Sequence, residues 1–370
     1  MIAWNQADRL LVVRLDALGD MLMSGPAIRA LAESRPSRQI TVLTSPAGCP
    51  AAALLPGVSE ILTYEAPWMK ATSPRSNAQS DLDLIDGLRR EHFDGAVIFT
   101  VYSQSALPAA LLCFLAEIPL RLAYCRENPY QLLTDWAREI EPEQGVRHEV
   151  RRLLDLVATI GCQTTDERIR VHLPGEAGLR TRQMLDFLGI DDGTLWAVIH
   201  PGASASSRRY PPAMFAQACR ELAIEHGMRL VFTGGKNEQP LVDEIRKAMN
   251  APSDSLVGKL ALPELAALLS AAPLLIANNT GPVHLAAAVG CPVVVLYALT
   301  NPQHTPWLAP SRVLNHDVPC RWCYKSICPQ EHQDCLRKVP PAAVVGAALE
   351  LLFEFRRRPT PANPARSMQS

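Results

Sequence analysis

Four short turns carry most of the residues suited to catalysis or phosphate binding. The first spans residues 14–20 (Arg-Leu-Asp-Ala-Leu-Gly-Asp) and ends in Asp20. When a group is transferred to a hydroxyl, one carboxylate near the acceptor supplies the general base. Asp20 can equally serve as a cap for the helix that is expected to follow it. The turn therefore leaves two roles open for this carboxylate, catalysis and capping.

The second turn, residues 200–211, is rich in small residues, hydroxyls and arginines. It contains Ser204, Ser206 and Arg208. A guanidinium offers a planar set of donors to a phosphate, and serine hydroxyls can complete the contacts. The composition suits a diphosphate, although an ordinary solvated loop has the same composition.

The third and fourth turns offer a carboxylate and a helix N-terminus. Residues 233–238 end in Glu238 after two glycines, and such a carboxylate can accept hydrogen bonds from ribose hydroxyls. Residues 278–284 contain Thr280 and His284 and precede an expected helix, whose N-terminus attracts anions. The structural alternative for this last turn is that Thr280 only caps the helix and His284 only packs within it.

Four of the ten cysteines crowd into one stretch with the spacing Cys-x2-Cys-x4-Cys-x6-Cys. Four thiolates at such a spacing can hold a structural zinc or iron ion. The alternatives are ordinary free or packed thiols and, less favoured, disulfides. The residues concerned are Cys320, Cys323, Cys328 and Cys335.

The elements that must position these turns alternate between short apolar strands and helices. Such alternation predicts a parallel sheet, and it occurs twice, so we predict two α/β domains with a ligand cleft at their strand ends. The first domain is predicted to span residues 1–180 and the second 190–340, followed by a helix at 341–357 and a disordered tail at 358–370. The expected strands include residues 9–14, 39–44, 95–101, 196–200, 229–233, 274–277 and 292–297.

The overall composition limits the classes of partner. The chain has 370 residues, of which 48% are hydrophobic, and 36 basic residues balance 37 acidic ones. A net charge of −1 gives no field to gather a polyanion, so nucleic acid is not expected as a partner. The first residues lack the pattern of a secretory signal, and no apolar run is long enough to span a bilayer. We therefore expect a cytoplasmic protein.

Taken in order, the four turns resemble glycosyltransferase family 9, the ADP-heptose-dependent heptosyltransferases of lipopolysaccharide synthesis. The resemblance runs over about residues 9–352, and residues 279–288 (Asn-Thr-Gly-Pro-Val-His-Leu-Ala-Ala-Ala) are its most specific part. It implies a GT-B fold, in which two Rossmann-like domains face a cleft. The second domain would bind ADP-heptose, the first a lipopolysaccharide inner-core acceptor, and the final helix would return to the first domain.

The resemblance also implies roles for individual residues. The reaction would be inverting, with ADP as the leaving group and no metal required for catalysis. The donor-binding set would include the two serines of the second turn. Asp20 would be the base. Arg208, Thr280 and Gly281 would contact the diphosphate, and His284 would lie near the sugar and the phosphates. Glu238 would lie near the ribose, Leu260 beside the adenine, and Ser204 and Ser206 elsewhere on the donor.

Two departures leave the exact substrates open. Relatives in core synthesis usually carry Asp where this chain has Asn279, which the resemblance also places at the donor, and Arg208 stands where the family commonly has Lys. Alternatives within enzymes are a protein O-heptosyltransferase or a transferase of another nucleotide sugar. Cys-rich tails occur in parts of the family, including a protein-heptosylating branch with cysteine-bound iron. An alternative of another class is a non-catalytic nucleotide-binding scaffold with a metal-bound Cys finger.

Contact with the membrane would be peripheral, at the cytoplasmic face of the inner membrane. Six arginines are candidates for facing anionic lipid or acceptor phosphates, although exposed arginines are common on any surface. They are Arg35, Arg38, Arg89, Arg90, Arg151 and Arg152.

Overall fold

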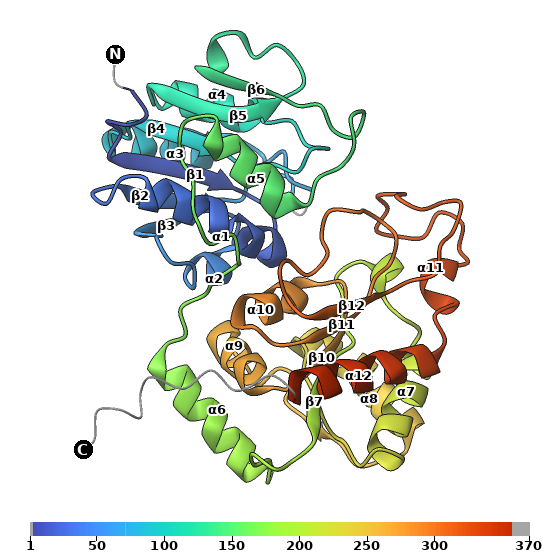
Figure 1. The fold of residues 1–370 in the computed structure, drawn as a ribbon. Coiled ribbons are helices and arrows are strands. Elements are labelled where there is room, and N and C mark those ends of the chain that lie inside the picture. The colour runs from blue at the N-terminus through green and yellow to red at the C-terminus, as the bar shows by residue number, and fades with distance from the viewer. Residues whose placement is uncertain (1–2, 71, 357–370) are drawn as a thin grey trace, which may run out of the picture.

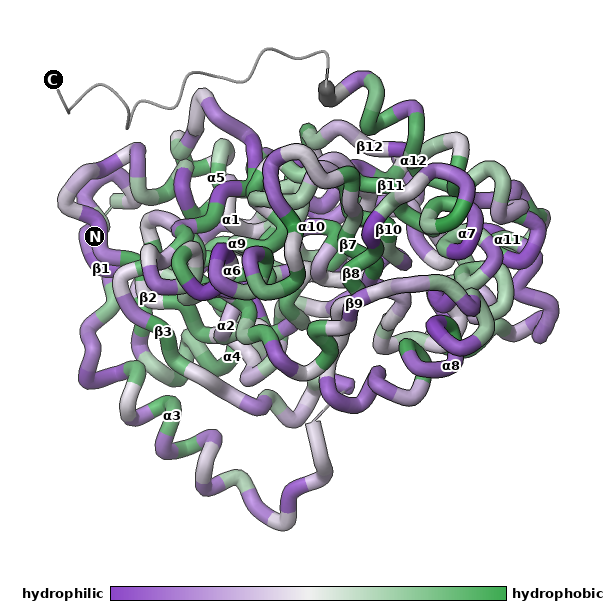
Figure 2. The backbone as a smooth tube through the Cα atoms, turned by 90° about the horizontal axis from the view of Figure 1, so that it is seen from below, coloured by the Kyte–Doolittle hydropathy of each residue, from purple (hydrophilic) through white to green (hydrophobic). Residues whose placement is uncertain are grey.

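The protein consists of two parallel six-stranded sheets, each covered by helices, in two stacked units (Figure 1). The structure is a computed structural model and describes residues 3–70 and 72–356. Hydrophobic stretches of chain concentrate toward the interior of each unit and hydrophilic stretches toward the periphery (Figure 2). The predicted α/β fold with two Rossmann-like units is confirmed.

The first sheet has the strand order β3-β2-β1-β4-β5-β6. Its central strand β1 is buried along five of six residues, because apolar side chains on both faces meet helices. Its strands are β1 (Arg9–Arg14), β2 (Gln39–Thr44), β3 (Glu60–Thr63), β4 (Gly95–Ile98), β5 (Leu120–Cys125) and β6 (Asp135–Arg138). The helices are α1 (Leu18–Glu33), α2 (Cys49–Ala52), α3 (Gln79–Arg90), α4 (Leu107–Leu115) and α5 (Glu149–Ala158), with a 3-10 turn η1 (Tyr130–Leu132).

The second sheet has the strand order β12-β11-β10-β7-β8-β9. Its strands are β7 (Trp196–His200), β8 (Arg229–Phe232), β9 (Asp254–Ser255), β10 (Leu275–Asn278), β11 (Val293–Leu296) and β12 (Ser311–Leu314). The helices are α6 (Gly175–Phe187), α7 (Pro212–Ile224), α8 (Gln239–Met249), α9 (Leu262–Ala271), α10 (Gly281–Val289), α11 (Asp334–Arg337) and α12 (Pro341–Arg356), with 3-10 turns η2 (Ser206–Arg208) and η3 (Lys236–Glu238).

Both sheets have the same topology. Counted along the chain within each unit, the strands lie in the order 3-2-1-4-5-6, the doubly wound arrangement. In such sheets the connections reverse direction between the first and fourth strands, and ligands bind beyond the carboxyl ends of the strands at that point. The switch lies between β1 and β4 in one unit and between β7 and β10 in the other. The four turns follow β1, β7, β8 and β10, at or beside these switch points.

The final helix differs from its predicted position. We expected it to return to the first domain, but α12 packs on α7, β11 and β12 of the second sheet. The reason is its apolar face, where Val344, Val345, Ala348 and Leu351 are buried in the core of that unit. Residue 357 and the predicted tail at 358–370 lie outside the described residues.

The region around the predicted domain boundary belongs spatially to the second unit. Helix α6, which straddles the predicted limit at residues 180–190, packs on α9. None of the helices in the part of the chain that the structure describes is both long and apolar enough to cross a bilayer.

Candidate active site

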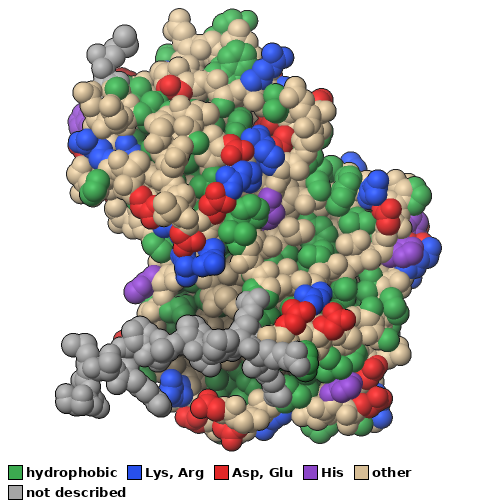
Figure 3. Space-filling view, in the orientation of Figure 1, with side chains coloured by type: hydrophobic (Ala, Val, Ile, Leu, Met, Phe, Trp, Pro, Cys, Tyr) green, Lys and Arg blue, Asp and Glu red, His purple; other side chains and the backbone are tan. Residues whose placement is uncertain are grey.

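The two units meet where α1 and α10 begin, and two glycines permit the contact. A Cβ on Gly19 would lie 3.0 Å from Cδ2 of His284, and a Cβ on Gly281 would lie 2.6 Å from Cδ2 of Leu18. Each glycine therefore lets the first turn of its helix pack closely against a side chain of the other helix. Figure 3 shows the two lobes with an indentation between them. The contact brings the turns after β1 and β10 together at one place.

Asp20 lies at this junction in the first turn of α1. Its carboxylate is 3.4 Å from Nη2 of Arg14, which is fully buried at the end of β1. Arg14 also pairs with Asp16 at 2.9 Å and with the buried Glu149 at 2.8 Å. Burial raises the pKa of both Asp16 and Glu149, and Arg14 opposes that rise. The guanidinium thus holds three carboxylates, of which Asp20 is the most exposed, at 22% of its side chain.

Three histidines lie close together at the junction, and one of them approaches Asp20. His304, in the loop after β11, has Nε2 3.9 Å from Oδ1 of Asp20. Burial lowers the pKa of His304, of His284 and of His148, that of His148 to about 4. Nearby positive charge, including that of Arg208, lowers the pKa of His284 and His304 further. All three rings are therefore neutral at pH 7 and can donate or accept hydrogen bonds without adding charge.

Several buried polar atoms near the junction have no hydrogen-bond partner within the described residues. They include Nε of Arg208, Nδ2 of Asn279, Nδ1 of His284 and Nε2 of His304. Buried polar groups nearly always find a partner, so a group of orphaned nitrogens indicates the place of a polar ligand. Since Arg208 is cationic and the amide of Asn279 is a donor, this set suits an anion.

The N-terminus of α10 completes this set. Thr280 occupies the N-cap position, but its hydroxyl makes no capping hydrogen bond. The hydroxyl of Thr280 and the N–H of Gly281 therefore remain available to a phosphate, whereas Pro282 has no N–H and that of Val283 donates to the carbonyl of Thr280 at 3.0 Å. The side chain of Asn278 donates to the carbonyl of Pro201 at 2.7 Å and accepts from the N–H of Tyr210 at 3.0 Å. These bonds fix the turn after β7 to the end of β10.

Glu238 lies beyond β8, on the other side of the turn after β7. Its carboxylate accepts from the N–H of Gly235 at 2.8 Å and lies 3.9 Å from Nε2 of His200. A Cβ on Gly202 would stand 1.8 Å from Oε1 of Glu238, so only glycine fits there. Leu260 is half-buried against the core of the protein. The ribose and adenine roles of Glu238 and Leu260 stay predictions.

The two predicted serines lie at the edge of the Cys-rich segment, residues 318–335. Ser204 is exposed, and the hydroxyl of Ser206 donates to the carbonyl of Ser326 at 3.3 Å. The neighbouring Ser207 donates its hydroxyl to the carbonyl of Lys325 at 2.7 Å. The Cys-rich segment therefore supports the turn after β7 from outside, and the donor role of both predicted serines stays a prediction.

The same segment also reaches the first unit. Nζ of Lys70, in the loop after β3, donates to Oγ of Ser326 at 3.3 Å. Tyr102 and Tyr324 pack edge to face with ring centroids 5.8 Å apart. Residues 318–335 therefore contact both units at once.

The four clustered cysteines line one small cavity of about 20 Å3 together with His332. All ten cysteines of the chain are free. Within residues 3–70 and 72–356, no three or more His, Cys, Asp or Glu side chains group closely enough to hold a metal ion. The predicted metal site at Cys320, Cys323, Cys328 and Cys335 is therefore not supported by the structure.

The sequence analysis missed His148, Glu149 and His304. Nε2 of His148 donates to the carbonyl of Thr305 at 2.8 Å, and its ring stacks on Trp307 at 4.4 Å. The loop after β11 thus docks on the start of α5. The sequence could have indicated His304, because this residue follows a predicted strand, as the four turns do. The carboxyl ends of such strands face the cleft.

Comparison with known proteins decides the family. A family sequence model described as glycosyltransferase family 9 (heptosyltransferase) matches residues 82–333. The chain belongs to this family. It is therefore a glycosyltransferase, as the ordered turns predict.

Relatives within glycosyltransferase family 9 extend over nearly the whole chain. Lipopolysaccharide heptosyltransferase 3 of Escherichia coli is 26% identical over 90% of this chain and 96% of its own length. Lipopolysaccharide heptosyltransferase 2 of Salmonella typhimurium is 25% identical over 94% of this chain and 99% of its own length. The solved structure of the E. coli ADP-heptose lipopolysaccharide heptosyltransferase II superimposes with a TM-score of 0.72 at 22% identity, covering 94% of this chain and 99% of that one. The shared fold is that of the GT-B family members.

Proposed function

We propose that this chain transfers heptose from ADP-heptose to a hydroxyl of a lipopolysaccharide inner-core precursor, with Asp20 as the general base. The family and the names of the full-length relatives support this donor and this acceptor. One observation carries the mechanism: a carboxylate from the first unit meets unpartnered buried nitrogens of the second unit at a single junction. The protein would act in the cytoplasm, with peripheral contact to the inner membrane.

In this mechanism the second unit binds the leaving group. Arg208, Thr280 and the N-terminus of α10 would contact the diphosphate of ADP-heptose. Negative charge on the diphosphate grows as the bond to the anomeric carbon breaks. Donors fixed beforehand at that position stabilise this charge most effectively in the transition state. These protein groups supply the charge stabilisation, so we propose that catalysis requires no cofactor.

The first unit would activate the acceptor. Asp20 accepts the proton of the acceptor hydroxyl while the oxygen attacks the anomeric carbon from the face opposite ADP, so the configuration inverts. Arg14, held by Glu149, fixes the carboxylate of Asp20 in place. The neutral ring of His304 lies 3.9 Å from the same carboxylate and can orient it.

The first test is calorimetric titration of the chain with ADP, UDP and GDP without divalent metal, followed by a transfer assay with ADP-heptose. Selective binding of ADP and transfer of heptose would support the proposal. A preference for UDP would point to another sugar donor. Binding without any transfer would favour a nucleotide-binding scaffold.

Asn279 favours one alternative within the same chemistry. Its buried Nδ2 is unpartnered and offers a hydrogen-bond donor where a carboxylate would only accept. A different pattern of sugar hydroxyls would suit such a donor, so another ADP-linked sugar is the second candidate. Competition between ADP-heptose and ADP-glucose in the transfer assay separates the two. Transfer to a protein acceptor would require no change in this half of the site.

A further inference from the structure

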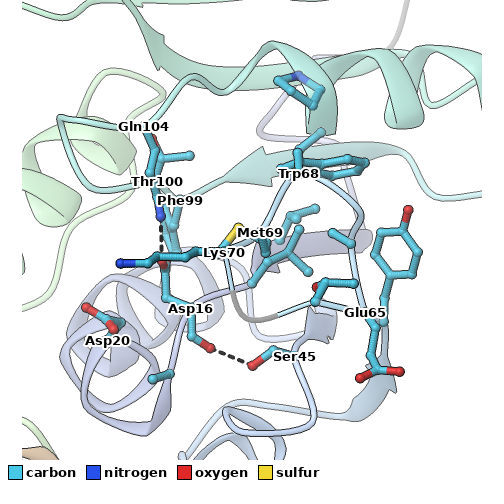
Figure 4. A pocket seen from close by; sticks show the side chains of 18 of the residues that line it. Asp16, Asp20, Ser45, Glu65, Trp68, Met69, Lys70, Phe99, Thr100 and Gln104 are labelled. Atoms are coloured by element: carbon cyan, nitrogen blue, oxygen red, sulfur yellow. Dashed lines mark hydrogen bonds between the residues drawn. The ribbon is translucent and has the colours of Figure 1, made fainter. Parts of the chain in front are cut away.

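A large pocket in the first unit opens beside Asp20. It has a volume of about 720 Å3, within the range of sites that enclose a whole small-molecule ligand. It lies at the carboxyl ends of β1 to β4, and Asp20 and Asp16 are among its lining residues (Figure 4). A hydroxyl bound at that end of the pocket would face the proposed base. We call this cavity the acceptor pocket.

The walls of the acceptor pocket are mainly apolar. Phe99 and Ile98 are almost fully buried beneath it, and Trp68 and Met69 extend over it from the loop after β3 (Figure 4). Trp68 is 36% exposed and packs edge to face on Tyr64. Such aromatic surfaces suit the C–H faces of a sugar ring, whereas the negative face of an aromatic ring disfavours an anion.

The charges of the acceptor pocket disfavour anions. Three carboxylates line it, those of Asp16, Asp20 and Glu65, against the ammonium of Lys70 and the buried guanidinium of Arg14, which pairs with Asp16 and Asp20. Lys70 extends toward the side where Asp20 lies (Figure 4). Its Nζ donates to Oγ of Ser326. A phosphate or carboxylate brought into this pocket would meet an excess of one negative charge among these groups, which disfavours its binding.

The six arginines considered for anionic contacts do not line this pocket. Arg38 and Arg152 are buried within the first unit, which also removes them as candidates for a membrane surface. Arg35 pairs with Asp8 at 2.6 Å and Arg89 with Asp86 at 2.7 Å. Arg151 pairs with Glu167. The sixth, Arg90, is exposed at the end of α3.

We propose that the acceptor pocket binds an uncharged sugar unit whose apolar faces pack on Trp68, and that it rejects a unit bearing phosphate or carboxylate. The inference rests on the proposed function for the identity of the pocket as the acceptor site. To the proposed function it adds that the terminal sugar unit of the acceptor is neutral. Charged groups elsewhere on a larger acceptor would lie outside the pocket.

Binding of two matched ligands tests this directly. The full chain, saturated with ADP, is titrated by calorimetry with a neutral methyl disaccharide of heptose and with the same disaccharide carrying one phosphate. We expect the neutral ligand to bind at least about tenfold more tightly. Equal or tighter binding of the phosphorylated ligand, or binding of neither, would overturn the proposal.

Two variants locate the effect in the pocket. Glu65→Lys should reduce the difference between the two ligands by at least about threefold, because it reverses one lining charge, whereas the exposed Glu225→Lys on the second unit should leave it unchanged. Trp68→Ala should weaken binding of the neutral ligand by at least about fivefold, whereas Tyr130→Ala, at an exposed aromatic outside the pocket, should not. Equal effects of Trp68→Ala and Tyr130→Ala would contradict the assignment.

These binding results stand apart from the transfer reaction. If the neutral ligand binds in the predicted way but ADP-heptose is not a donor, the proposed function fails and the pocket assignment holds. If heptose is transferred but the phosphorylated ligand binds better, the pocket assignment fails and the proposed function holds.

Discussion

At the scale of single residues, the junction combines one accessible carboxylate with a buried guanidinium. Arg14 cannot reach solvent, and its three carboxylate partners come from two parts of the chain, the turn after β1 and the start of α5. A charge buried this deeply must be matched by opposite charge nearby. The position of Asp20 is therefore determined by a network that would exist even without substrate.

Asp20→Asn tests the catalytic role of this carboxylate. The amide keeps the shape but cannot accept a proton, so kcat should fall at least about a hundredfold, the lower end for general-base catalysis. ADP affinity, measured by calorimetry, should stay within about twofold because Asp20 belongs to the first unit. An equal loss of turnover and ADP binding would show that Asp20 supports the donor site instead.

Arg208→Ala tests the donor side. Removal of one charged hydrogen bond to the diphosphate should weaken ADP binding by about 1.5–3 kcal/mol. Arg182→Ala, at an exposed arginine of α6, is the matched control and should leave the dissociation constant unchanged. An unchanged constant in Arg208→Ala would remove this residue from the site.

At the scale of elements, the beginnings of α1 and α10 act as one structural unit. Each helix contributes a glycine that the other helix approaches closely. The sequence could place both helices, because Gly and Pro at their starts mark strand-to-helix turns. It could not show that the two turns touch, since that depends on how the units pack.

Gly281→Ala tests the contact between these two helices. Its new methyl group would lie 2.6 Å from Leu18, so the units should separate slightly and kcat/KM should fall about tenfold. Gly346→Ala, in α12 with nothing within 4 Å, is the control and should raise stability by about 0.4–1 kcal/mol with activity unchanged. Full activity of Gly281→Ala would mean that Leu18 moves aside freely.

The elements also separate what the sequence predicts from what it cannot. Strands β1 and β2 agree with the expected residues 9–14 and 39–44, since buried parallel strands are short apolar runs. The extent of α12 was also close to its prediction, but its partner was wrong, because an apolar helix face does not specify which core it joins. The spacing of the four cysteines likewise suggested a set of metal ligands. Whether their thiols come together in space depends on the tertiary fold, which the spacing does not specify.

At the scale of the whole molecule, the loop after β11 links the two units through His148. Nothing in the sequence pattern marks this histidine, because its role comes from a distant carbonyl and from Trp307. Its burial in the contact lowers its pKa from 6.5 to about 4. The contact between the units is thus sensitive to protonation.

The pH dependence of stability follows from this shift. Between pH 6.5 and about 4 the unfolded chain binds a proton at His148 that the folded chain does not, so stability falls as pH drops through that window. His284 and His304 act in the same direction. We expect the Tm to fall from pH 7 to pH 5 and His148→Phe, which keeps an aromatic ring on Trp307, to flatten that slope. An identical slope in the variant would assign the effect to other groups.

The Cys-rich segment has a thermodynamic consequence. Because Ser326 accepts from Ser206 beside the donor turn and from Lys70 in the acceptor pocket, a donor that shifts the turn also shifts Lys70. Linkage is reciprocal: if ADP changes the affinity for the neutral acceptor by some factor, the acceptor must change the affinity for ADP by the same factor. Ser326→Ala, which removes only the bond to Lys70, should bring both factors closer to one. Cooperation between the two substrates would then reside in a segment that takes no part in the chemistry.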